Sequence, residues 1–361
     1  MEQDAIFSLE NGLARICLNR PKALNSLSLA MIRAITGQLL AWREDQAVEA
    51  VLIYSSSEKA FCAGGDIRFF YDVGTKTPQG DSALLEDFFT EEYALNHLIH
   101  YYPKPYIALM NGIVMGGGMG IAQAGPECRL RIVTDTTKMA MPEVNIGLFP
   151  DVGGSYFLAQ TPGQIGPYLG LTGAIIKAAD AIYAGLADLY LPSAQTAQLI
   201  ADLGHIPGRE AVEFIRQFCA AAMTELPAST LSEQRRLIDE VFAQATVPAI
   251  LNKLLANPDD FAKTTHQLML SRSPLMMAVT LEQLRRGKTM SVADCLRMER
   301  DMVRHCFKHG EVLEGVRALV IDKDNQAKWS IANVNDVHAD QVAAFFAPVW
   351  PAYAHPLRHL D

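Results

Sequence analysis

Short apolar segments separated by turn-forming residues recur through the first 192 residues of this 361-residue chain. Two alternating segments flank Asn11-Gly12, a dipeptide typical of a tight β-hairpin turn. Further apolar segments occupy residues 50–54, 105–110 and 129–133, and helical patterns lie between them. This alternation predicts an α/β fold in which helices pack outside sheets.

The pattern changes beyond about residue 193, where glycine becomes sparse and helical periodicity dominates. Ser291 is a candidate helix N-cap, and apolar residues follow it at helical spacing: Val292, Cys295, Leu296, Met302, Val303, Cys306 and Phe307. We therefore predict a core region at residues 1–192 that carries the active site. Residues 193–361 are expected to form a mainly helical region packed on that core.

Composition excludes several classes of partner and location. The net charge is −9 without a long basic run, which argues against nucleic acid as a partner. No stretch approaches the ~18 apolar residues of a membrane span. The six cysteines form no CxxC pair, which is typical of reduced thiols, and the N-terminal residues lack the features of a signal or transit peptide. These observations predict a cytoplasmic protein.

Two glycine-rich turns follow apolar strands, at residues 61–67 and 115–120. Glycine clusters permit positive φ and let a ligand approach backbone N–H groups closely. Two such donors from separate turns could form an oxyanion hole. The alternative is tight packing of a helix start against a sheet. Neither turn is a dinucleotide-binding motif, because Ile121 occupies the place of the third glycine.

The segment from Met141 to Gly154 carries two carboxylates, Glu143 and Asp151, among apolar residues, glycines and prolines. Burying a carboxylate is costly unless it is paired or hydrogen-bonded. Such environments also shift pKa values toward the range that acid–base chemistry uses. The segment therefore predicts a catalytic acid pair, the alternative being a loop whose two acids cap turns.

Together with residues 19–25, these motifs resemble the crotonase superfamily, the enoyl-CoA hydratase/isomerase fold, in the family's order and spacing. The resemblance implies a spiral of ββα repeats and a CoA-thioester substrate. It also implies an oxyanion hole made by the backbone N–H groups of Gly65 and Gly117. The substrate-binding residues that it implies are Lys22, Ala23, Leu24, Asp66 and Arg68. Lys22 is the first candidate to contact a CoA phosphate and Arg68 the second.

One departure from the hydratase pattern is informative. Hydratases of this superfamily use two glutamates, of which Glu143 matches one, whereas Gly120 stands at the place of the other. Asp151 in turn stands where the hydratases have glycine. This pattern resembles the 3-hydroxyisobutyryl-CoA hydrolase branch, and similar segments at 91–96 and 314–329 extend the resemblance over nearly the whole chain. The branch also implies that Glu92 contacts the substrate.

The resemblance implies hydrolysis of a short branched 3-hydroxyacyl-CoA, namely 3-hydroxyisobutyryl-CoA, in valine catabolism. Glu143 would act as general base or as nucleophile. Asp151 would orient water or the substrate hydroxyl, or protonate the leaving thiolate. No metal or cofactor is expected beyond the coenzyme A of the substrate. The alternatives are a hydratase or isomerase on the same fold, and a non-catalytic acyl-CoA binding protein; a homo-oligomer is left open.

Overall fold

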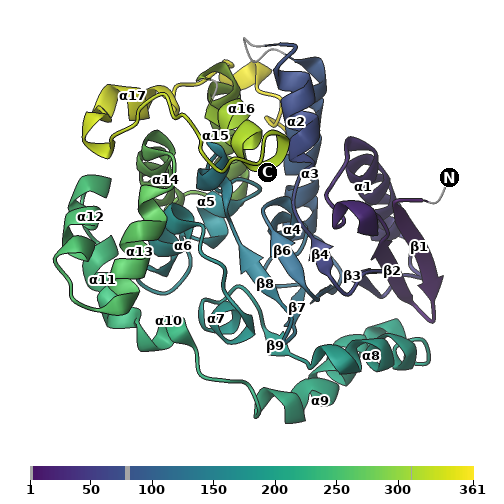
Figure 1. Cartoon of the computed structure of the whole chain (residues 1–361). Helices are drawn as coiled ribbons and strands as arrows, with labels where there is room; N and C mark the ends of the chain where they lie inside the picture. The colour runs from purple at the N-terminus through teal and green to yellow at the C-terminus, as the bar shows by residue number, and fades with distance from the viewer. Residues whose placement is uncertain (1–2, 78–81, 310) are drawn as a thin grey trace. The chain divides into compact units, whose positions relative to one another are not determined.

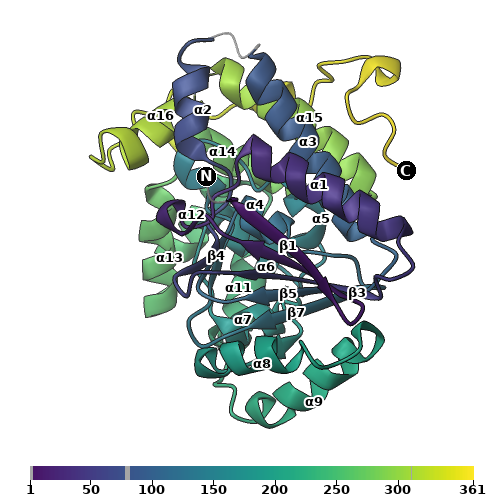
Figure 2. The same ribbon diagram turned by 90° about the vertical axis from the view of Figure 1, so that its right-hand side faces the viewer.

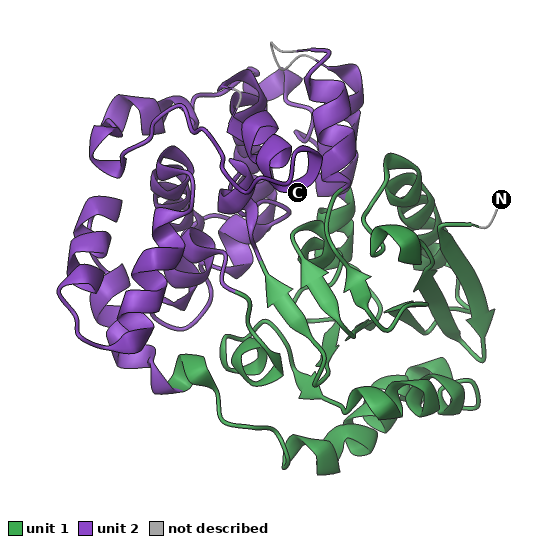
Figure 3. Cartoon of the chain, viewed as in Figure 1, with its two compact units in different colours: residues 1–65, 95–140, 175–232 green, residues 66–94, 141–174, 233–361 purple. Residues whose placement is uncertain are grey.

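A computed structural model of the chain describes residues 3–77, 82–309 and 311–361 (Figure 1). The chain divides into two compact units, each made of three separate segments (Figure 3). Unit 1 comprises residues 1–65, 95–140 and 175–232, and unit 2 comprises residues 66–94, 141–174 and 233–361. The boundary predicted after residue 192 separates two kinds of sequence pattern, and it stays a prediction.

Unit 1 holds the strands. Among the described residues, one sheet has six strands in the order β1-β2-β3-β5-β7-β9, and a second sheet has three in the order β4-β6-β8. Among the strands that the structure describes, β1 and β2 pair antiparallel and the other neighbours in both sheets are parallel. The strands span β1 Ala5–Glu10, β2 Leu13–Leu18, β3 Ala50–Ser55, β4 Ala60–Cys62, β5 Tyr106–Met110, β6 Ile113–Met115, β7 Arg129–Val133, β8 Lys138–Ala140 and β9 Leu189–Tyr190.

Successive strands alternate between the two sheets. β3, β5 and β7 lie in the larger sheet, and the strand that follows each of them, β4, β6 or β8, lies in the smaller one. Each pair is a repeat that advances by one strand in both sheets, which is the predicted spiral of ββα repeats. The predicted hairpin is also confirmed, because Asn11 and Gly12 adopt φ of 50° and 83°, as a type I′ turn requires.

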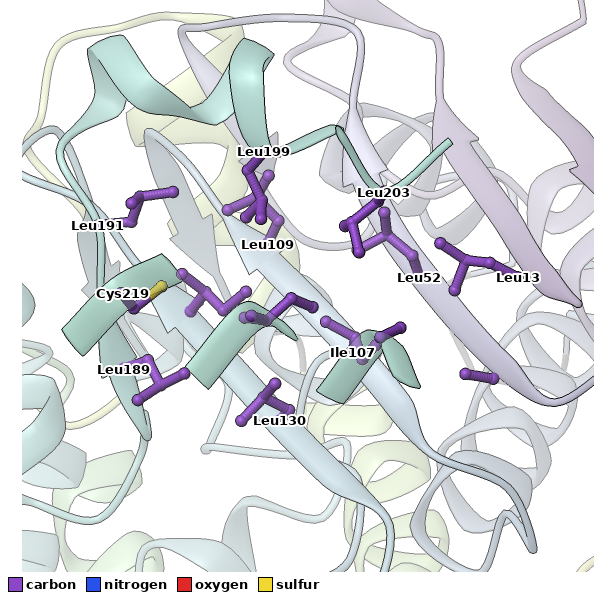
Figure 4. Packing of buried hydrophobic residues seen from close by; sticks show 14 residues of the cluster. Leu13, Leu52, Ile107, Leu109, Leu130, Leu189, Leu191, Leu199, Leu203 and Cys219 are labelled. Carbon is purple, nitrogen blue, oxygen red and sulfur yellow. The ribbon is translucent and has the colours of Figure 1, made fainter. Parts of the chain in front are cut away.

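The core of unit 1 lies on one face of the larger sheet (Figure 4). Leu52, Leu109 and Leu130 project to this face from three neighbouring strands, as the two-residue period of a strand dictates. Leu199 and Leu203 of the α8 region and Cys219 of α9 cover them. The opposite face of the larger sheet is buried as well. The sequences of β3 and β5 are therefore almost continuously apolar, which is typical of parallel sheets.

Short helices complete unit 1. α1 lies along the β1–β2 end of the larger sheet, with Trp42 packed edge-on against Phe7 (Figure 2). Ser28 accepts the N–H of Met31 and caps this helix as its sequence predicts. The helices are η1 Pro21–Ala23, α1 Leu29–Glu44, α4 Gly117–Gly120, α7 Ala178–Tyr183, η3 Ser193–Gln195, α8 Thr196–Asp202, η4 Gly208–Glu210 and α9 Ala211–Met223.

Unit 2 is helical, and the predicted helical character of the C-terminal region is confirmed. α3 (Ala83–His100) and α10 (Thr230–Glu233) each cross a boundary between the segments of the two units. The other helices are α2 Ile67–Gly74, η2 Glu143–Ile146, α5 Gly154–Phe157, α6 Ile165–Thr172, α11 Arg235–Phe242, α12 Val247–Leu255, α13 Asp260–Leu270, α14 Pro274–Gly287, α15 Val292–His309, α16 Glu311–Val316, the π-helix η5 Arg317–Ile321, η6 Val334–Asp336, α17 Ala339–Ala344 and η7 Ala352–Ala354. None of the helices within the described ranges is long and apolar enough to cross a membrane.

An aromatic cluster fixes the first half of α3 within unit 2. Phe70 of α2 packs on Phe88 and Phe89 of α3 at centroid distances of 4.9 and 5.0 Å. Phe307 of α15 closes the cluster against Phe89 at 5.7 Å. Aromatic pairs at these separations add to the free energy of burial. The cluster thereby holds the turn of α3 that carries Glu92 and Tyr93.

Candidate active site

The two glycine turns of unit 1 lie against each other. β4 and β6 are parallel neighbours, so the turns that follow them leave the same edge of the small sheet. A Cβ on Gly64, at φ of 97°, would lie 3.0 Å from the Met115 carbonyl oxygen and 3.4 Å from the Gly117 nitrogen. A Cβ on Gly118 would lie 2.2 Å from the Cys62 carbonyl oxygen. The contact between the turns therefore requires glycine at both positions.

The amides of Gly65 and Gly117 are unoccupied donors. Gly117 is the first residue of α4, where backbone N–H groups have no partner inside the helix. Within the described part of the chain, neither N–H donates a hydrogen bond to a backbone or side-chain acceptor. Such donors can bind an oxyanion that develops on a ligand.

The segment Lys22–Leu24 lies beside the first glycine turn. It forms the 3-10 turn η1, and Leu24 ends it at φ of 51°. The N–H of Ala63 donates to the Leu24 carbonyl oxygen at 3.1 Å, and the N–H of Leu27 donates to that of Gly64 at 2.8 Å. The structure thus brings Ala23 and Leu24 next to Gly65, while the Lys22 side chain is exposed.

The other two residues predicted to bind the substrate lie in unit 2. The Asp66 carboxylate accepts the N–H of Phe69 at 3.3 Å and so caps α2. Arg68 is exposed, and its guanidinium lies 3.5 Å from the Val320 carbonyl oxygen. Asp66 therefore has a structural role at the start of α2 whatever it contacts in a substrate.

Unit 2 buries the three predicted carboxylates. Glu143 and Asp151 are each 5% exposed, and Glu92 is 2% exposed. Glu143 begins the 3-10 turn η2, and Asp151 begins a turn closed by a 2.7 Å hydrogen bond from the Gly154 N–H to its carbonyl oxygen. Among the described residues, Glu143 Oε2 and Glu92 Oε1 have no hydrogen-bond partner. Each of these two acids therefore presents a buried oxygen that a substrate or water can use.

Burial and mutual repulsion shift the acidity of these groups. Burial, reinforced by the negative charge of Asp151, raises the pKa of Glu143 and of Glu92 well above the usual range. Burial also raises the pKa of Asp151 to about 6, against a hydrogen bond from Tyr93 that lowers it. At neutral pH the cluster therefore holds groups that can both accept and donate protons, as acid–base catalysis requires.

Two residues that the sequence did not single out support Asp151. Tyr93 donates its hydroxyl hydrogen to Asp151 Oδ2 at 2.7 Å. Glu299 of α15 accepts the N–H groups of Gly153 and Ser155 at 2.8 and 2.9 Å. Tyr93 lies in the segment 91–96 that carried the resemblance, next to Glu92. The sequence feature that could have identified Glu299 is its position one turn after Leu296, on the face of α15 that carries the periodic apolar residues. An acid at such a position interrupts the apolar pattern.

Close contacts with α16 hold the turn that carries Glu143. A Cβ on Gly147, at φ of 71°, would lie 2.2 Å from the Glu311 carbonyl oxygen. A Cβ on Gly315 would lie 2.3 Å from the Ile146 carbonyl carbon. The N–H of Ser273 also donates to the Val144 carbonyl oxygen at 3.2 Å. The position of Glu143 therefore depends on α16, about 170 residues further along the chain.

Replacing Tyr93 with Phe is expected to raise the pKa of Asp151. The tyrosine hydroxyl stabilises the ionised carboxylate, and a hydrogen bond to a charged group contributes about 1.5–3 kcal/mol. The limb of the pH–rate profile that reports Asp151 should therefore move to higher pH by at least about one pH unit. The measurement is the profile of kcat/KM, with Tyr353→Phe as the control because Tyr353 is 82% exposed. An unchanged profile in Tyr93→Phe would contradict this role.

The described residues contain no group of three or more His, Cys, Asp and Glu side chains arranged to hold a metal ion. The six cysteines, whose positions lie inside the described ranges, form no disulfide bond with one another. Cys62, beside the first glycine turn, is buried.

The model of the enoyl-CoA hydratase/isomerase family matches residues 13–346. The chain is 40% identical over 336 residues to a mitochondrial 3-hydroxyisobutyryl-CoA hydrolase of Xenopus tropicalis, covering 92% of this chain and 85% of the relative. It is 36% identical over 355 residues to the small ribosomal subunit protein mS47 of Neurospora crassa, covering 93% and 69%. A crystal structure of a carnitinyl-CoA dehydratase from Mycobacterium thermoresistibile superposes with a TM-score of 0.89 at 40% identity, covering 97% of this chain and 98% of that one.

The predicted cytoplasmic location is wrong on these comparisons. The Xenopus tropicalis relative is named as mitochondrial, which contradicts the expectation of a cytoplasmic protein. The prediction depended on reduced cysteines, on the lack of an apolar span and on N-terminal residues without the features of a signal or transit peptide. The first two features suit any reducing aqueous compartment, so they could not separate the two locations.

Proposed function

Because the chain belongs to the enoyl-CoA hydratase/isomerase family, we propose that it hydrolyses 3-hydroxyisobutyryl-CoA to 3-hydroxyisobutyrate and coenzyme A. The observation that carries the proposal is the buried pair Glu143 and Asp151, with Tyr93 bonded to Asp151. Gly120 leaves no carboxylate where a hydratase has its second glutamate. The acid pair is therefore arranged for attack on a carbonyl rather than for adding water across a double bond.

In the proposed reaction the N–H groups of Gly65 and Gly117 bind the thioester oxygen. The negative charge on that oxygen grows as the carbonyl carbon becomes tetrahedral, so the two hydrogen bonds strengthen in the transition state. Single donors of this kind contribute roughly 3–4 kcal/mol to catalysis. The backbone N–H groups of Gly65 and Gly117, which have no acceptor among the described residues, support this role.

Glu143 would activate the nucleophile. As a general base it takes a proton from water while the water oxygen bonds to the thioester carbon. The tetrahedral intermediate then collapses, the C–S bond breaks, and the thiolate of coenzyme A takes a proton from Glu143 or Asp151. As a nucleophile Glu143 would instead displace the thiolate and form a mixed anhydride that water hydrolyses. Its buried, raised-pKa carboxyl group supports a role in proton transfer.

The remaining residues would bind the substrate. Glu92 would accept the 3-hydroxyl group, which suits a buried carboxyl oxygen without a protein partner. Lys22, Ala23 and Leu24 would contact coenzyme A, with Lys22 the first candidate to contact a phosphate and Arg68 the second. Asp66 would also contact the substrate. Coenzyme A enters as part of the substrate, and the proposal includes no resident cofactor. Valine catabolism is the pathway that this substrate implies, and a homo-oligomer remains an expectation.

The test compares two substrates under the same conditions. Release of free coenzyme A from 3-hydroxyisobutyryl-CoA should exceed hydration of crotonyl-CoA by at least about 10²-fold in kcat/KM. Hydration of crotonyl-CoA as the faster reaction would favour the hydratase, which the name of the Mycobacterium thermoresistibile relative suggests. Binding without turnover of either ester would favour a non-catalytic role, and mS47 shows that a relative of similar identity is named as a ribosomal protein.

A further inference from the structure

Among the described residues of unit 2, Glu299 is the most deeply buried acid outside the predicted site. It is 0% exposed and lies on α15 between Leu296 and Met302, on a buried face that is apolar apart from Glu299 and Arg300. A carboxylate at such a position costs several kcal/mol unless it is hydrogen-bonded. It persists because its two oxygens each accept one backbone N–H, Oε2 from Gly153 and Oε1 from Ser155.

Both donors belong to the turn that starts at Asp151. Val152 adopts φ of 53° and Gly153 adopts φ of 88°, so two consecutive residues lie in the left-handed region. For valine, a β-branched residue, that conformation is strained and is retained only where the surroundings enforce it. The bidentate contact with Glu299 supplies that enforcement, because it fixes the residues on both sides of Gly154.

Three elements hold this turn at different atoms. Glu299 of α15 holds its backbone, and Tyr93 of α3 holds the Asp151 side chain. Gln283 of α14 donates to the Pro150 carbonyl oxygen at 2.5 Å and to Ser155 Oγ at 2.8 Å. Glu299 is the member of this set that is itself an acid, and its charge repels that of Asp151. It therefore affects both the position and the acidity of the pair.

We propose that Glu299 is a positioning residue for catalysis, holding the turn 151–155 in its strained form so that Asp151 keeps its place relative to Glu143. The inference rests on the proposed hydrolase function and extends it to a residue 148 positions beyond Asp151 in sequence. Glu299 has no contact with the reacting atoms in this assignment. Its effect reaches them through the backbone of Gly153 and Ser155.

Several titratable groups surround Glu299, and they affect what a substitution at this position changes. Asp151 and Tyr93 face it from the turn and from α3, Glu143 is repelled by it, and Cys295 lies one turn earlier on α15. Burial raises the pKa of Glu299 to about 8, against the two backbone hydrogen bonds that lower it. Glu299 is therefore largely protonated at pH 7, so a neutral substitution there changes its hydrogen bonds more than its charge.

The substitution Glu299→Gln tests the proposal. Glutamine keeps the shape but offers one acceptor oxygen, and its NH₂ group faces the second backbone N–H, so one hydrogen bond is lost. Because a displacement of about 1 Å can cost 10²-fold, kcat should fall by about 10²-fold while KM changes less than about threefold. Glu299→Asp keeps both acceptor oxygens and should recover part of the loss in kcat. Glu282→Gln, on the partly exposed ion pair with Arg286, is the matched control and should leave kcat unchanged.

Hydrogen–deuterium exchange separates this inference from the proposed function. In Glu299→Gln the amides of Gly153 and Ser155 should exchange at least about tenfold faster than in the wild type, with other core amides unchanged. If the wild-type protein does not release coenzyme A, the proposed hydrolase function is refuted. The exchange rates of Gly153 and Ser155 would still show whether Glu299 holds this turn. Wild-type hydrolysis with unchanged kcat in Glu299→Gln, or unchanged exchange at Gly153 and Ser155, would refute the positioning role.

Discussion

Replacing Glu143 with Gln is expected to lower kcat for 3-hydroxyisobutyryl-CoA by at least about 10³-fold, because a positioned general base contributes 10²–10⁴-fold and an amide cannot take its proton. The same result follows if Glu143 is the nucleophile, since an amide cannot form the anhydride. The fold should survive, because the variant replaces a buried acid with a neutral group of the same shape.

The measurement separates chemistry from binding. Turnover is followed by release of free coenzyme A, and binding by calorimetry with a non-hydrolysable thioether analogue of the substrate. The analogue should bind Glu143→Gln within about threefold of the wild type, as expected when a group acts mainly in the transition state. Glu240→Gln, a partly exposed acid paired with Lys253, is the control. Near-normal turnover in Glu143→Gln would remove Glu143 from the mechanism.

Isotope labelling of the wild type decides what Glu143 does. Single-turnover hydrolysis in ¹⁸O-water is followed by mass analysis of the peptide that contains Glu143. Label in that carboxyl group requires a mixed anhydride opened by water at the enzyme side, and so establishes the nucleophilic route. Label confined to the 3-hydroxyisobutyrate is expected of a general base and equally of an anhydride opened at the acyl carbon, so only label in Glu143 excludes the general-base route.

What the sequence predicts well is what a short segment determines by itself. The hairpin at Asn11-Gly12, the cap at Ser28 and the glycine turns follow from local backbone preferences, and the structure has them at those residues. The two acids of the segment 141–154 are predicted for the same reason. An acid among apolar residues and glycines is a local departure from pattern, which one segment is enough to reveal.

The supports of the site are a different case, because they come from distant parts of the chain. Glu299 reaches Gly153 from 146 residues away, and Tyr93 reaches Asp151 from 58 residues away. The periodicity of the sequence shows which face of α15 is apolar. It does not show which backbone segment an acid on that face will contact in the folded chain. The compact units are likewise built from three segments each, so no boundary in sequence could describe them.

Replacing Asp151 with Asn is expected to reduce activity and to raise stability at neutral pH. Either role proposed for Asp151, orienting a reactant or delivering a proton, uses a carboxyl group, so kcat should fall by about 10²–10³-fold. The gain in stability follows from linkage. Burial raises the pKa of Asp151 in the folded chain to about 6 from an ordinary value of 3.8. Folding is therefore penalised by the ionised carboxylate, and the asparagine variant lacks that penalty.

The dependence of this gain on pH distinguishes it from other effects of the substitution. The penalty is absent below pH 3.8, grows as the pH rises toward about 6, and is complete above that value. Since one pKa unit corresponds to about 1.4 kcal/mol, the full penalty is about 3 kcal/mol. For a chain of this size, removing that penalty should raise the Tm by roughly 4 °C. Calorimetry at pH 4 and pH 7 should show a higher Tm for Asp151→Asn only at pH 7. An equal Tm difference at both pH values would mean that the variant changes packing, and a lower Tm at pH 7 would mean that ionised Asp151 stabilises the fold. The expected result makes Asp151 a residue retained for catalysis at the expense of stability, since the protein would be more stable without its charge.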